Sequence, residues 1–275
     1  MNRTMTQNQL KLELHGNESF VQRLGSAVLF DVHSLIDMHR SGILGGEQMP
    51  EDVHPKLDRS SRELAHYFTL GMALNYQRNS YSLWRSCTTA WDDEATRWIY
   101  YPEAVVARSI EELKEALVRH RVALQPNNHV KIWYTICRSL SGSYSADVRQ
   151  LFRSSEGRIS EIKAAIAREK KGFPYLAGPK ICNYWLYVMM SYTENGLCEK
   201  HALNVAPDTH VINASSRLGV ISEAEAAHPS AQGIVVERWT HLLDGTDLDP
   251  IDIHTPLWLW SRSGFLPLRS NSTHT

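Results

Sequence analysis

Apolar positions recur at helical spacing along most of the chain, whereas runs that alternate with a period of two are weak. Residues 60–77 illustrate the pattern with a stripe made of Leu64, Tyr67, Phe68 and Met72. Residues 157–170 and 230–244 have the same spacing. The pattern therefore predicts an all-α protein with roughly ten helices of ordinary length.

Local signals predict where several of these helices begin. Ser109 is followed three residues later by Glu112, which is the spacing of a capping box. Thr255 and Pro256 form a suitable N-cap and first-turn pair for a helix that carries Trp258. We therefore expect helices to begin close to residues 110 and 256.

The chain of 275 residues is long enough for one large domain or two compact helical lobes around a cleft. Residues 1–18 and 267–275 are expected to be polar tails that flank one helical domain over residues 19–266. The first ten residues lack the apolar segment of a secretory signal, and the apolar run Tyr184–Met190 is too short to span a bilayer. We expect a cytoplasmic protein without a membrane span.

Charge and cysteine content limit the possible partners. The chain has 29 basic and 30 acidic residues, so a nucleic acid would have to bind through a local patch or backbone amides. The cysteines are too scattered for a zinc or iron–sulfur site and are expected to be reduced thiols: Cys87, Cys137, Cys182 and Cys198. No metal or cofactor is expected.

The segment 173–190 combines a turn with an apolar helix and carries the first candidate for chemistry. Gly178 and Pro179 form the turn, which places Lys180 in the first turn of the helix. The helix dipole and burial near a cleft both lower an amine pKa from about 10.4 toward neutrality, where it becomes a nucleophile. Amides of the same turn can hold a phosphate. The alternative is a solvated lysine that follows a turn.

Asp208 precedes a second predicted helix and is the other candidate. The apolar face of that helix consists of Val211, Ala214, Ser215 and Leu218. A plain N-cap is one interpretation of Asp208. A carboxylate at a helix N-terminus also stays ionised at neutral pH, so it can stabilise positive charge on a sugar or accept a proton.

Together, the two segments resemble the helix-hairpin-helix DNA glycosylase superfamily. Gly178 and Lys180 match the second glycine and the lysine of its hairpin, and residues 207–211, with the sequence Pro-Asp-Thr-His-Val, match its aspartate segment. Leu176 replaces the first glycine of the hairpin. The resemblance implies a glycosylase fold of two helical lobes around a cleft, with Lys180 and Asp208 as the catalytic pair.

Two flanking segments are similar to the archaeal 8-oxoguanine glycosylase branch. Residues 73–77, with Tyr81 and Trp84, resemble one of its segments, and residues 251–258 resemble its C-terminal motif. The separation of Lys180 from Asp208 exceeds that in the endonuclease III branch and is a feature of the archaeal branch. His254 stands where that branch has an acidic residue that contacts the base.

The resemblance also implies a binding site. Tyr184 lies four residues after Lys180 on the same helix face, where it can stack on an extruded base. The substrate-binding candidates are Gln77, Tyr184, His254 and Trp258, and the DNA-binding candidates are Lys171, Ala177 and Gly178. Core packing is the alternative for each aromatic residue, and Trp133 and Trp185 are assigned to the core.

The resemblance implies a monomeric base-excision enzyme that binds double-stranded DNA, flips out one nucleotide and cleaves its N-glycosidic bond. A Schiff base on Lys180 would add strand cleavage at the abasic site. An oxidised purine such as 8-oxoguanine is the expected substrate, and His254 leaves room for a modified pyrimidine or a hypermodified phage base instead. A queuosine-type nucleosidase or a non-catalytic DNA-binding module would also be compatible with these segments.

Overall fold

The computed structural model describes residues 25–44 and 49–268. Within these ranges the regular elements are helices and there is no β-strand; one isolated bridge pairs Arg158 with Cys198. The all-α prediction is confirmed. The chain has more helices than the sequence pattern indicated, because α4 and α11 have only 5 and 4 residues and are too short to show a hydrophobic repeat.

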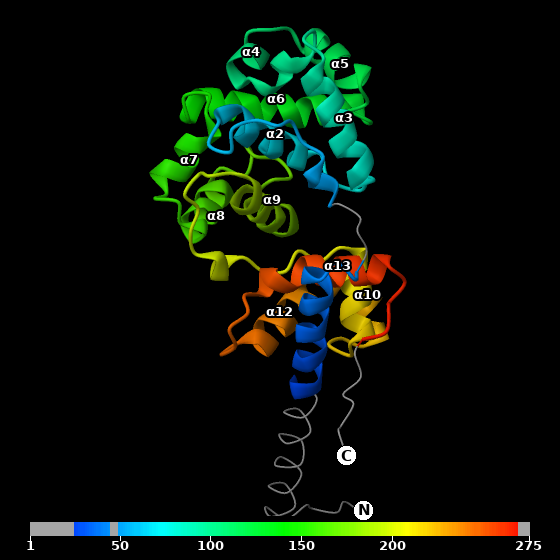
Figure 1. The fold of residues 1–275 in the computed structure, drawn as a ribbon. Coiled ribbons are helices and arrows are strands. Elements are labelled where there is room, and N and C mark those ends of the chain that lie inside the picture. Colours follow the sequence, from blue (N-terminus) through cyan, green and yellow to red (C-terminus); the bar gives the residue numbers. More distant parts are fainter. Residues whose placement is uncertain (1–24, 45–48, 269–275) are drawn as a thin grey trace, which may run out of the picture. The chain divides into compact units, whose positions relative to one another are not determined.

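Backbone contacts divide the chain into two compact units (Figure 1). The described part of unit 2 runs from residue 49 to residue 206, whereas unit 1 combines residues 25–44 with residues 207–268. The α-helices of unit 2 are α2 (Arg62–Ala73), α3 (Ser80–Asp92), α4 (Pro102–Val106), α5 (Ile110–Arg119), α6 (Pro126–Ser143), α7 (Val148–Ser154), α8 (Ile159–Arg168) and α9 (Pro179–Tyr192). Its 3-10 helices are η1 (Pro50–Asp52), η2 (Arg97–Tyr100) and η3 (Lys200–Ala202).

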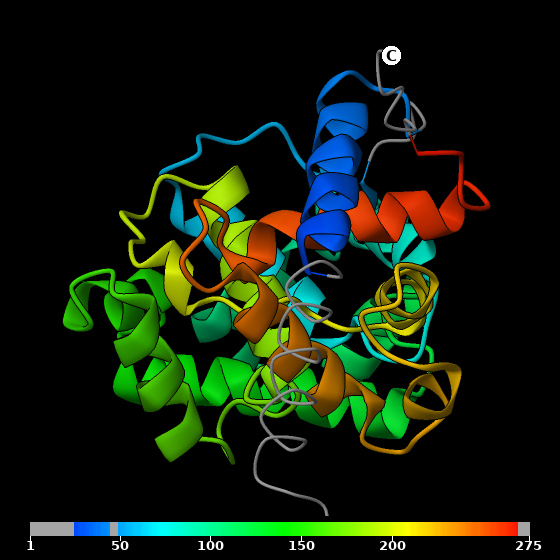
Figure 2. The same cartoon turned by 90° about the horizontal axis from the view of Figure 1, so that it is seen from below.

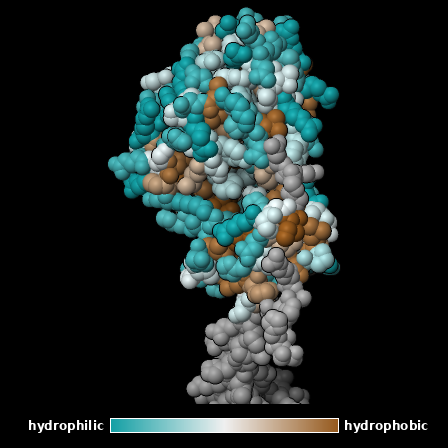
Figure 3. Space-filling view, viewed as in Figure 1, coloured by the Kyte–Doolittle hydropathy of each residue, from teal (hydrophilic) through white to brown (hydrophobic). Residues whose placement is uncertain are grey.

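The core of unit 2 centres on α2, which packs against α6, α7 and α9. Ten consecutive residues of α2, Leu64 to Ala73, are buried. Trp133 of α6 and Trp185 of α9 are fully buried, as the sequence predicts, and the indole N–H of Trp185 donates to Thr69 Oγ1 at 3.1 Å. On the face drawn in Figure 3, hydrophilic side chains cover most of unit 2 and apolar residues form small separate patches.

Unit 1 consists of a helix over residues 25–40 together with α10 (Thr209–Arg217), α11 (Glu223–Ala226), α12 (Ala231–Leu243), η4 (Pro250–Ile253) and α13 (His254–Arg262). The helix of residues 25–40, drawn in blue, crosses α13, drawn in red, in both Figure 1 and Figure 2. The contact between α10 and α13 is extensive, and Trp239 of α12 donates its indole N–H to Ser215 of α10 at 2.8 Å. These contacts hold α10 within the helical core of unit 1.

The local signals place most helix ends correctly. The capping box of Ser109 and Glu112 begins α5, and Asp208 is the N-cap of α10. The N-cap assigned to Thr255 is wrong: α13 begins at His254 and Ile253 is its N-cap. The 3-10 helix η4 runs directly into α13, so the chain is already helical when it reaches Thr255.

Both predicted tails fall largely outside the described residues. The N-terminal tail, residues 1–18, lies entirely outside them, and of residues 267–275 only 267 and 268 are described. Among the described helices, none is long and apolar enough to cross a membrane. Three cysteines are buried, Cys198 is exposed, and all four carry free thiols.

The close packing of α2 against α3 gives a stability prediction at Gly71. A Cβ added there would lie 2.7 Å from Cζ3 of the buried Trp84 ring, whereas one added at Gly142 of α6 would meet nothing within 4 Å. We expect Gly71→Ala to lower the free energy of unfolding by about 1–3 kcal/mol, because overpacking outweighs the gain in helix propensity. Gly142→Ala, the control in the same unit, should be neutral or stabilising. Urea denaturation measures both, and equal effects would contradict the packing argument.

Candidate functional site

The first turn of α9 contains Lys180, as predicted. Gly178 is the N-cap of α9, Pro179 is its first residue, and Lys180 is half-buried. Asn183, which is buried on α9, donates through Nδ2 to the carbonyl of Pro179 at 2.7 Å. Lys163 of α8 donates to Asn183 Oδ1 at 3.1 Å and so ties this turn to the neighbouring helix. The backbone that carries Lys180 is therefore held by a hydrogen-bonded side chain inside the unit.

The turn before α9 is closed by its own backbone. Tyr175 takes a left-handed conformation with φ of 63°, which is uncommon for a residue other than glycine. The N–H of Ala177 donates to the backbone carbonyl of Phe173 at 3.0 Å, and the N–H of Gly178 donates to the backbone carbonyl of Tyr175 at 2.9 Å. Both N–H groups are already hydrogen-bonded within the turn. The backbone N–H groups in the first turn of α9 are therefore better placed to bind a phosphate. The DNA contacts of Ala177 and Gly178 stay predictions.

Exposed basic side chains precede the turn. Arg168 is the last residue of α8, and Lys170 and Lys171 follow it; all three are exposed. Lys171 was the DNA-binding candidate from the sequence, and its exposure fits that role without testing it. A polyanion at the start of α9 would meet positive charge from this segment.

Tyr184 has an acidic partner that the sequence did not indicate. Its phenol donates to Oε1 of Glu51, a residue of η1 that is only 1% exposed. Burial raises the pKa of Glu51 from 4.5 to about 7, while the hydrogen bond from Tyr184 acts in the opposite direction. A buried carboxyl group that titrates near neutral pH is a typical component of functional sites. The sequence missed it because Glu51 lies in a short polar stretch without a motif.

Gln77 lies next to the turn that precedes α9. It is exposed, has φ of 49°, and lines a small pocket with Tyr76, Asn128 and Tyr175. The Tyr76 and Tyr175 rings are 5.1 Å apart, and Asn128 Nδ2 lies 3.4 Å from the Tyr175 hydroxyl. This pocket measures about 30 Å³, which is the size of a water molecule and not of a base. The structure thus brings Gln77 to the predicted hairpin without forming a base-sized cavity there.

In unit 1, Asp208 and Trp258 are in direct contact. Asp208 Oδ1 accepts the N–H of Val211 at 2.9 Å, which is the N-cap bond of α10. Its Oδ2 accepts the indole N–H of Trp258 at 2.9 Å, which links α10 to α13. His210 contacts the same indole with ring centroids 5.4 Å apart. Both carboxylate oxygens are therefore held in defined positions.

His254 and Trp258 share one face of α13. They are four residues apart, both are buried, and His254 is the first residue of the helix. The guanidinium of Arg262 lies over the Trp258 ring at 4.9 Å from its centroid. His254 is thus placed one helical turn from the residue that holds Asp208.

The predicted site residues divide between the two units. Unit 1 contains Asp208, His254 and Trp258. Unit 2 contains Gln77, Lys171, Ala177, Gly178, Lys180 and Tyr184. Within unit 1 the structure joins Asp208 to Trp258, and within unit 2 it places Gln77 beside the turn that precedes α9. The pairing of Lys180 with Asp208 stays a prediction.

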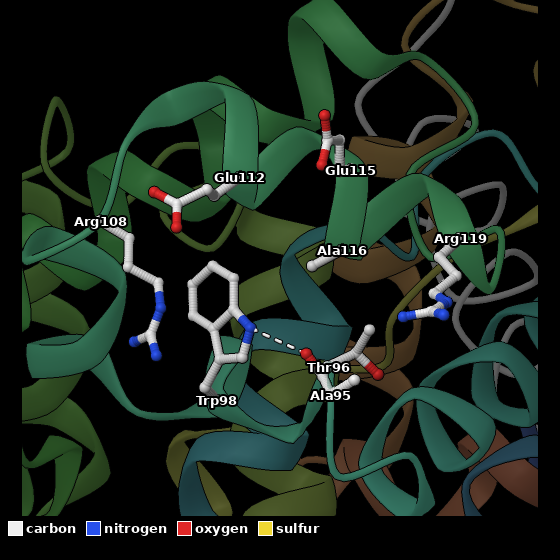
Figure 4. A pocket seen from close by; sticks show the side chains of 8 residues that line it. All are labelled: Ala95, Thr96, Trp98, Arg108, Glu112, Glu115, Ala116 and Arg119. Atoms are coloured by element: carbon white, nitrogen blue, oxygen red, sulfur yellow. Dashed lines mark hydrogen bonds between the residues drawn. The ribbon is translucent and has the colours of Figure 1, made fainter.

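A larger pocket of about 510 Å³ lies elsewhere on unit 2 (Figure 4). Its centre is the indole of Trp98, which donates to the carbonyl of Ala95 at 3.1 Å, and Arg108 lies over the ring at 4.4 Å from its centroid. The rest of its lining is charged or small: Thr96, Glu112, Glu115, Ala116 and Arg119. None of the predicted site residues lines this pocket.

Comparison with protein-family models found no match, and comparison with curated proteins found none either. Within residues 25–44 and 49–268, no group of three or more His, Cys, Asp and Glu side chains is arranged to hold a metal ion. The functional assignment therefore depends on the geometry around Lys180, Tyr184 and Asp208.

The raised pKa of Glu51 gives a prediction for the pH dependence of stability. The unfolded chain binds a proton at Glu51 up to about pH 4.5 and the folded chain up to about pH 7. The stabilisation from neutral Glu51 is fully present below pH 4.5 and is lost as pH rises through 7. Glu51→Gln remains neutral and keeps an oxygen acceptor for Tyr184. The free energy of unfolding of the variant, relative to the unaltered protein, should rise by up to about 3 kcal/mol across this window.

Urea denaturation at a series of pH values measures this difference. Glu115→Gln on α5, which removes an exposed carboxylate from the same unit, is the control. Parallel pH profiles for the Glu51→Gln variant and the unaltered protein would mean that Glu51 titrates like an ordinary carboxylate.

Proposed function

We propose that this protein is a DNA glycosylase that extrudes a modified base from double-stranded DNA and cleaves its N-glycosidic bond, with Lys180 and Asp208 as catalytic residues. The observation that carries the proposal is the geometry of Asp208. Its carboxylate is half-buried, begins a helix and is held through both oxygens by Val211 and Trp258. A carboxylate placed in this way suits the stabilisation of charge that develops during bond cleavage.

Asp208 would act on the sugar. Cleavage of the glycosidic bond leaves positive charge on the deoxyribose ring, and a negative oxygen close by lowers the energy of that state. The donors that hold Asp208 are a backbone N–H and an indole N–H, and because both are neutral they leave its negative charge in place. Because both donors are rigid, little reorganisation is needed during the reaction.

Lys180 would act as the nucleophile. Its amine nitrogen forms a bond to C1′ as the bond from C1′ to the base breaks, and the base leaves with the electron pair and takes up a proton. Loss of a proton from nitrogen and opening of the sugar ring then give a Schiff base, which permits strand cleavage at the abasic site. The position of Lys180 in the first turn of α9 favours an unprotonated amine because it opposes the helix dipole.

DNA would be held beside the same turn. The start of α9 can meet a phosphate, and Arg168, Lys170 and Lys171 add exposed positive charge before it. Gln77, which the structure places beside Tyr175, offers an amide for a base edge. The partner is double-stranded DNA, and the chemistry needs neither a redox cofactor nor a metal.

Oxidised purines such as 8-oxoguanine are the first substrate class to test. His254 can donate or accept one hydrogen bond, whereas the acidic residue expected at its position only accepts. A modified pyrimidine or a hypermodified phage base would fit a pocket with that altered polarity. Mass spectrometry of bases released from oxidised DNA and from modified phage DNA distinguishes these classes.

Borohydride trapping tests the roles of Lys180 and Asp208. Reduction of the Schiff base should leave a covalent adduct between the protein and a duplex that contains the modified base. We expect Lys180→Ala to abolish this adduct, because the attacking amine is removed, and Asp208→Asn to slow base release by about a hundredfold or more. Lys131→Ala, which removes an exposed lysine of α6, is the control and should trap normally.

Three outcomes separate the proposal from its rivals. Undiminished trapping in Lys180→Ala would remove Lys180 from the reaction. Release from free modified nucleosides that needs Asp208 but not Lys180 would favour a queuosine-type nucleosidase. DNA binding without release from any substrate would favour a non-catalytic module.

The bond between Trp258 and Asp208 gives a second prediction. Trp258→Phe removes the donor to Oδ2 and keeps an aromatic ring, so Asp208 loses one of its two fixed contacts. We expect base release to slow by about tenfold to a hundredfold, because the carboxylate is no longer held in one orientation. Trp260→Phe on the same helix is a matched control, since it also loses an indole N–H, but one that donates to the carbonyl of Leu266. Single-turnover rates compare the two, and equal rates would mean that Trp258 does not act through Asp208.

A further inference from the structure

Two adjacent acidic residues of η1 form parallel hydrogen bonds to α9. Glu51 Oε1 accepts from the phenol of Tyr184, and Asp52 Oδ1 accepts from the phenol of Tyr192 at 2.6 Å. Both bonds join the same two elements and have the same chemistry. They differ in position along α9, because Tyr192 follows Tyr184 by eight residues, or about two helical turns.

The two phenols have different neighbours. Tyr184 lies one turn after Lys180 on the same face of α9, and its ring is 6.0 Å from that of Tyr187, which continues this face. Tyr192 instead packs between His54 and Phe68, with ring centroids at 5.7 and 5.4 Å. The bond from Asp52 therefore holds a tyrosine that packs on His54 and Phe68, whereas the bond from Glu51 is made to a tyrosine on the face of α9 that carries Lys180.

One carboxyl oxygen of Glu51 lacks a hydrogen bond within the described part of the chain, although the residue is buried. Its side chain is 1% exposed, yet Oε2 has no hydrogen-bond partner among the described residues. An unpartnered oxygen of a buried carboxyl group destabilises the folded state, and most buried polar groups in proteins have a partner. Asp52, by contrast, uses both oxygens, because Oδ2 also accepts the N–H of Met49 at 2.7 Å. The cost at Glu51 suggests a function beyond stability.

We propose that Glu51 is a positioning residue that holds the ring of Tyr184, through its phenol, as a stacking wall for the extruded base. The inference rests on the proposed function. Stacking of a base on an aromatic side chain contributes to affinity, and it contributes more when the ring already has the required orientation. A hydrogen bond at the phenol fixes the orientation of the half-buried Tyr184 ring from the interior.

A double-mutant cycle tests the inference. Tyr184→Phe keeps the ring and removes its hydroxyl, and Glu51→Ala removes the acceptor. If Glu51 acts through the phenol, each variant should raise KM for a modified duplex about tenfold with a smaller change in kcat. The double variant should be no worse than either single variant, because both remove the same interaction. Glu51→Gln, which retains an acceptor oxygen, should restore most of the affinity.

The second acid–phenol pair supplies the matched control. Asp52→Ala and Tyr192→Phe break the parallel bond between the same elements, and they should lower the free energy of unfolding without changing KM. The fluorine NMR resonance of Tyr184 in fluorotyrosine-labelled protein, assigned by its absence in Tyr184→Phe, gives a readout without substrate. It should shift or broaden in Glu51→Ala and remain unchanged in Asp52→Ala.

The outcomes separate this inference from the proposed function. Base release with KM unaffected by Glu51→Ala and Tyr184→Phe overturns the positioning role and leaves the enzyme assignment intact. Equal KM effects of the Glu51 and Asp52 pairs also overturn it, because they indicate general destabilisation. If the unaltered protein releases no base, the proposed function is wrong, and an unchanged fluorine resonance in Glu51→Ala then shows that Glu51 does not hold the ring either.

Discussion

The burial of α9 against α2 is the constraint on which the arrangement of unit 2 depends. Seven of the fourteen residues of α9 are buried and only Pro179 and Ser191 are exposed, so hydrophobicity alone would permit several rotations of this helix about its axis. A buried indole usually has an acceptor, and the indole N–H of Trp185 donates to Thr69 inside the core. That bond fixes the rotation of α9 relative to α2. The direction of the face that carries Lys180 and Tyr184 is then determined, because helical geometry fixes the angle between these residues and Trp185 around the axis.

Polar side chains hold both ends of this apolar helix. Asn183 and Lys163 tie its first turn to α8, and Glu51 and Asp52 tie its middle and end to η1. Each such bond contributes little relative to water, but losing one partner in a buried position costs about 1–3 kcal/mol. The bonds therefore act mainly by raising the free energy of arrangements of α9 in which they are broken. The proposed role of Lys180 as a nucleophile would benefit from a backbone held in this way.

The sequence predicted those parts of the site that depend on a few neighbouring residues. Asp208 is an N-cap and Lys180 lies in a first turn, because caps and turns are decided within about four positions. The N-cap predicted at Thr255 from the same kind of local pattern is wrong, because η4 continues directly into α13 and the chain is already helical at Thr255. Glu51 was missed because its burial comes from packing with α9, which lies far away along the chain. The pairing of Lys180 with Asp208 has only the resemblance to support it.

The contact between Asp208 and Trp258 adds a link between α10 and α13 to the capping role of Asp208. An N-cap needs one oxygen, and Val211 already occupies Oδ1. A structural link to α13 through Oδ2 would be stronger with an arginine, which would also neutralise the charge. The chain instead supplies an indole N–H and places the nearby Arg262 over the ring of Trp258. The carboxylate is thereby oriented by neutral donors and not by a cation, which is the arrangement that the proposed reaction, with positive charge developing on the sugar, would use.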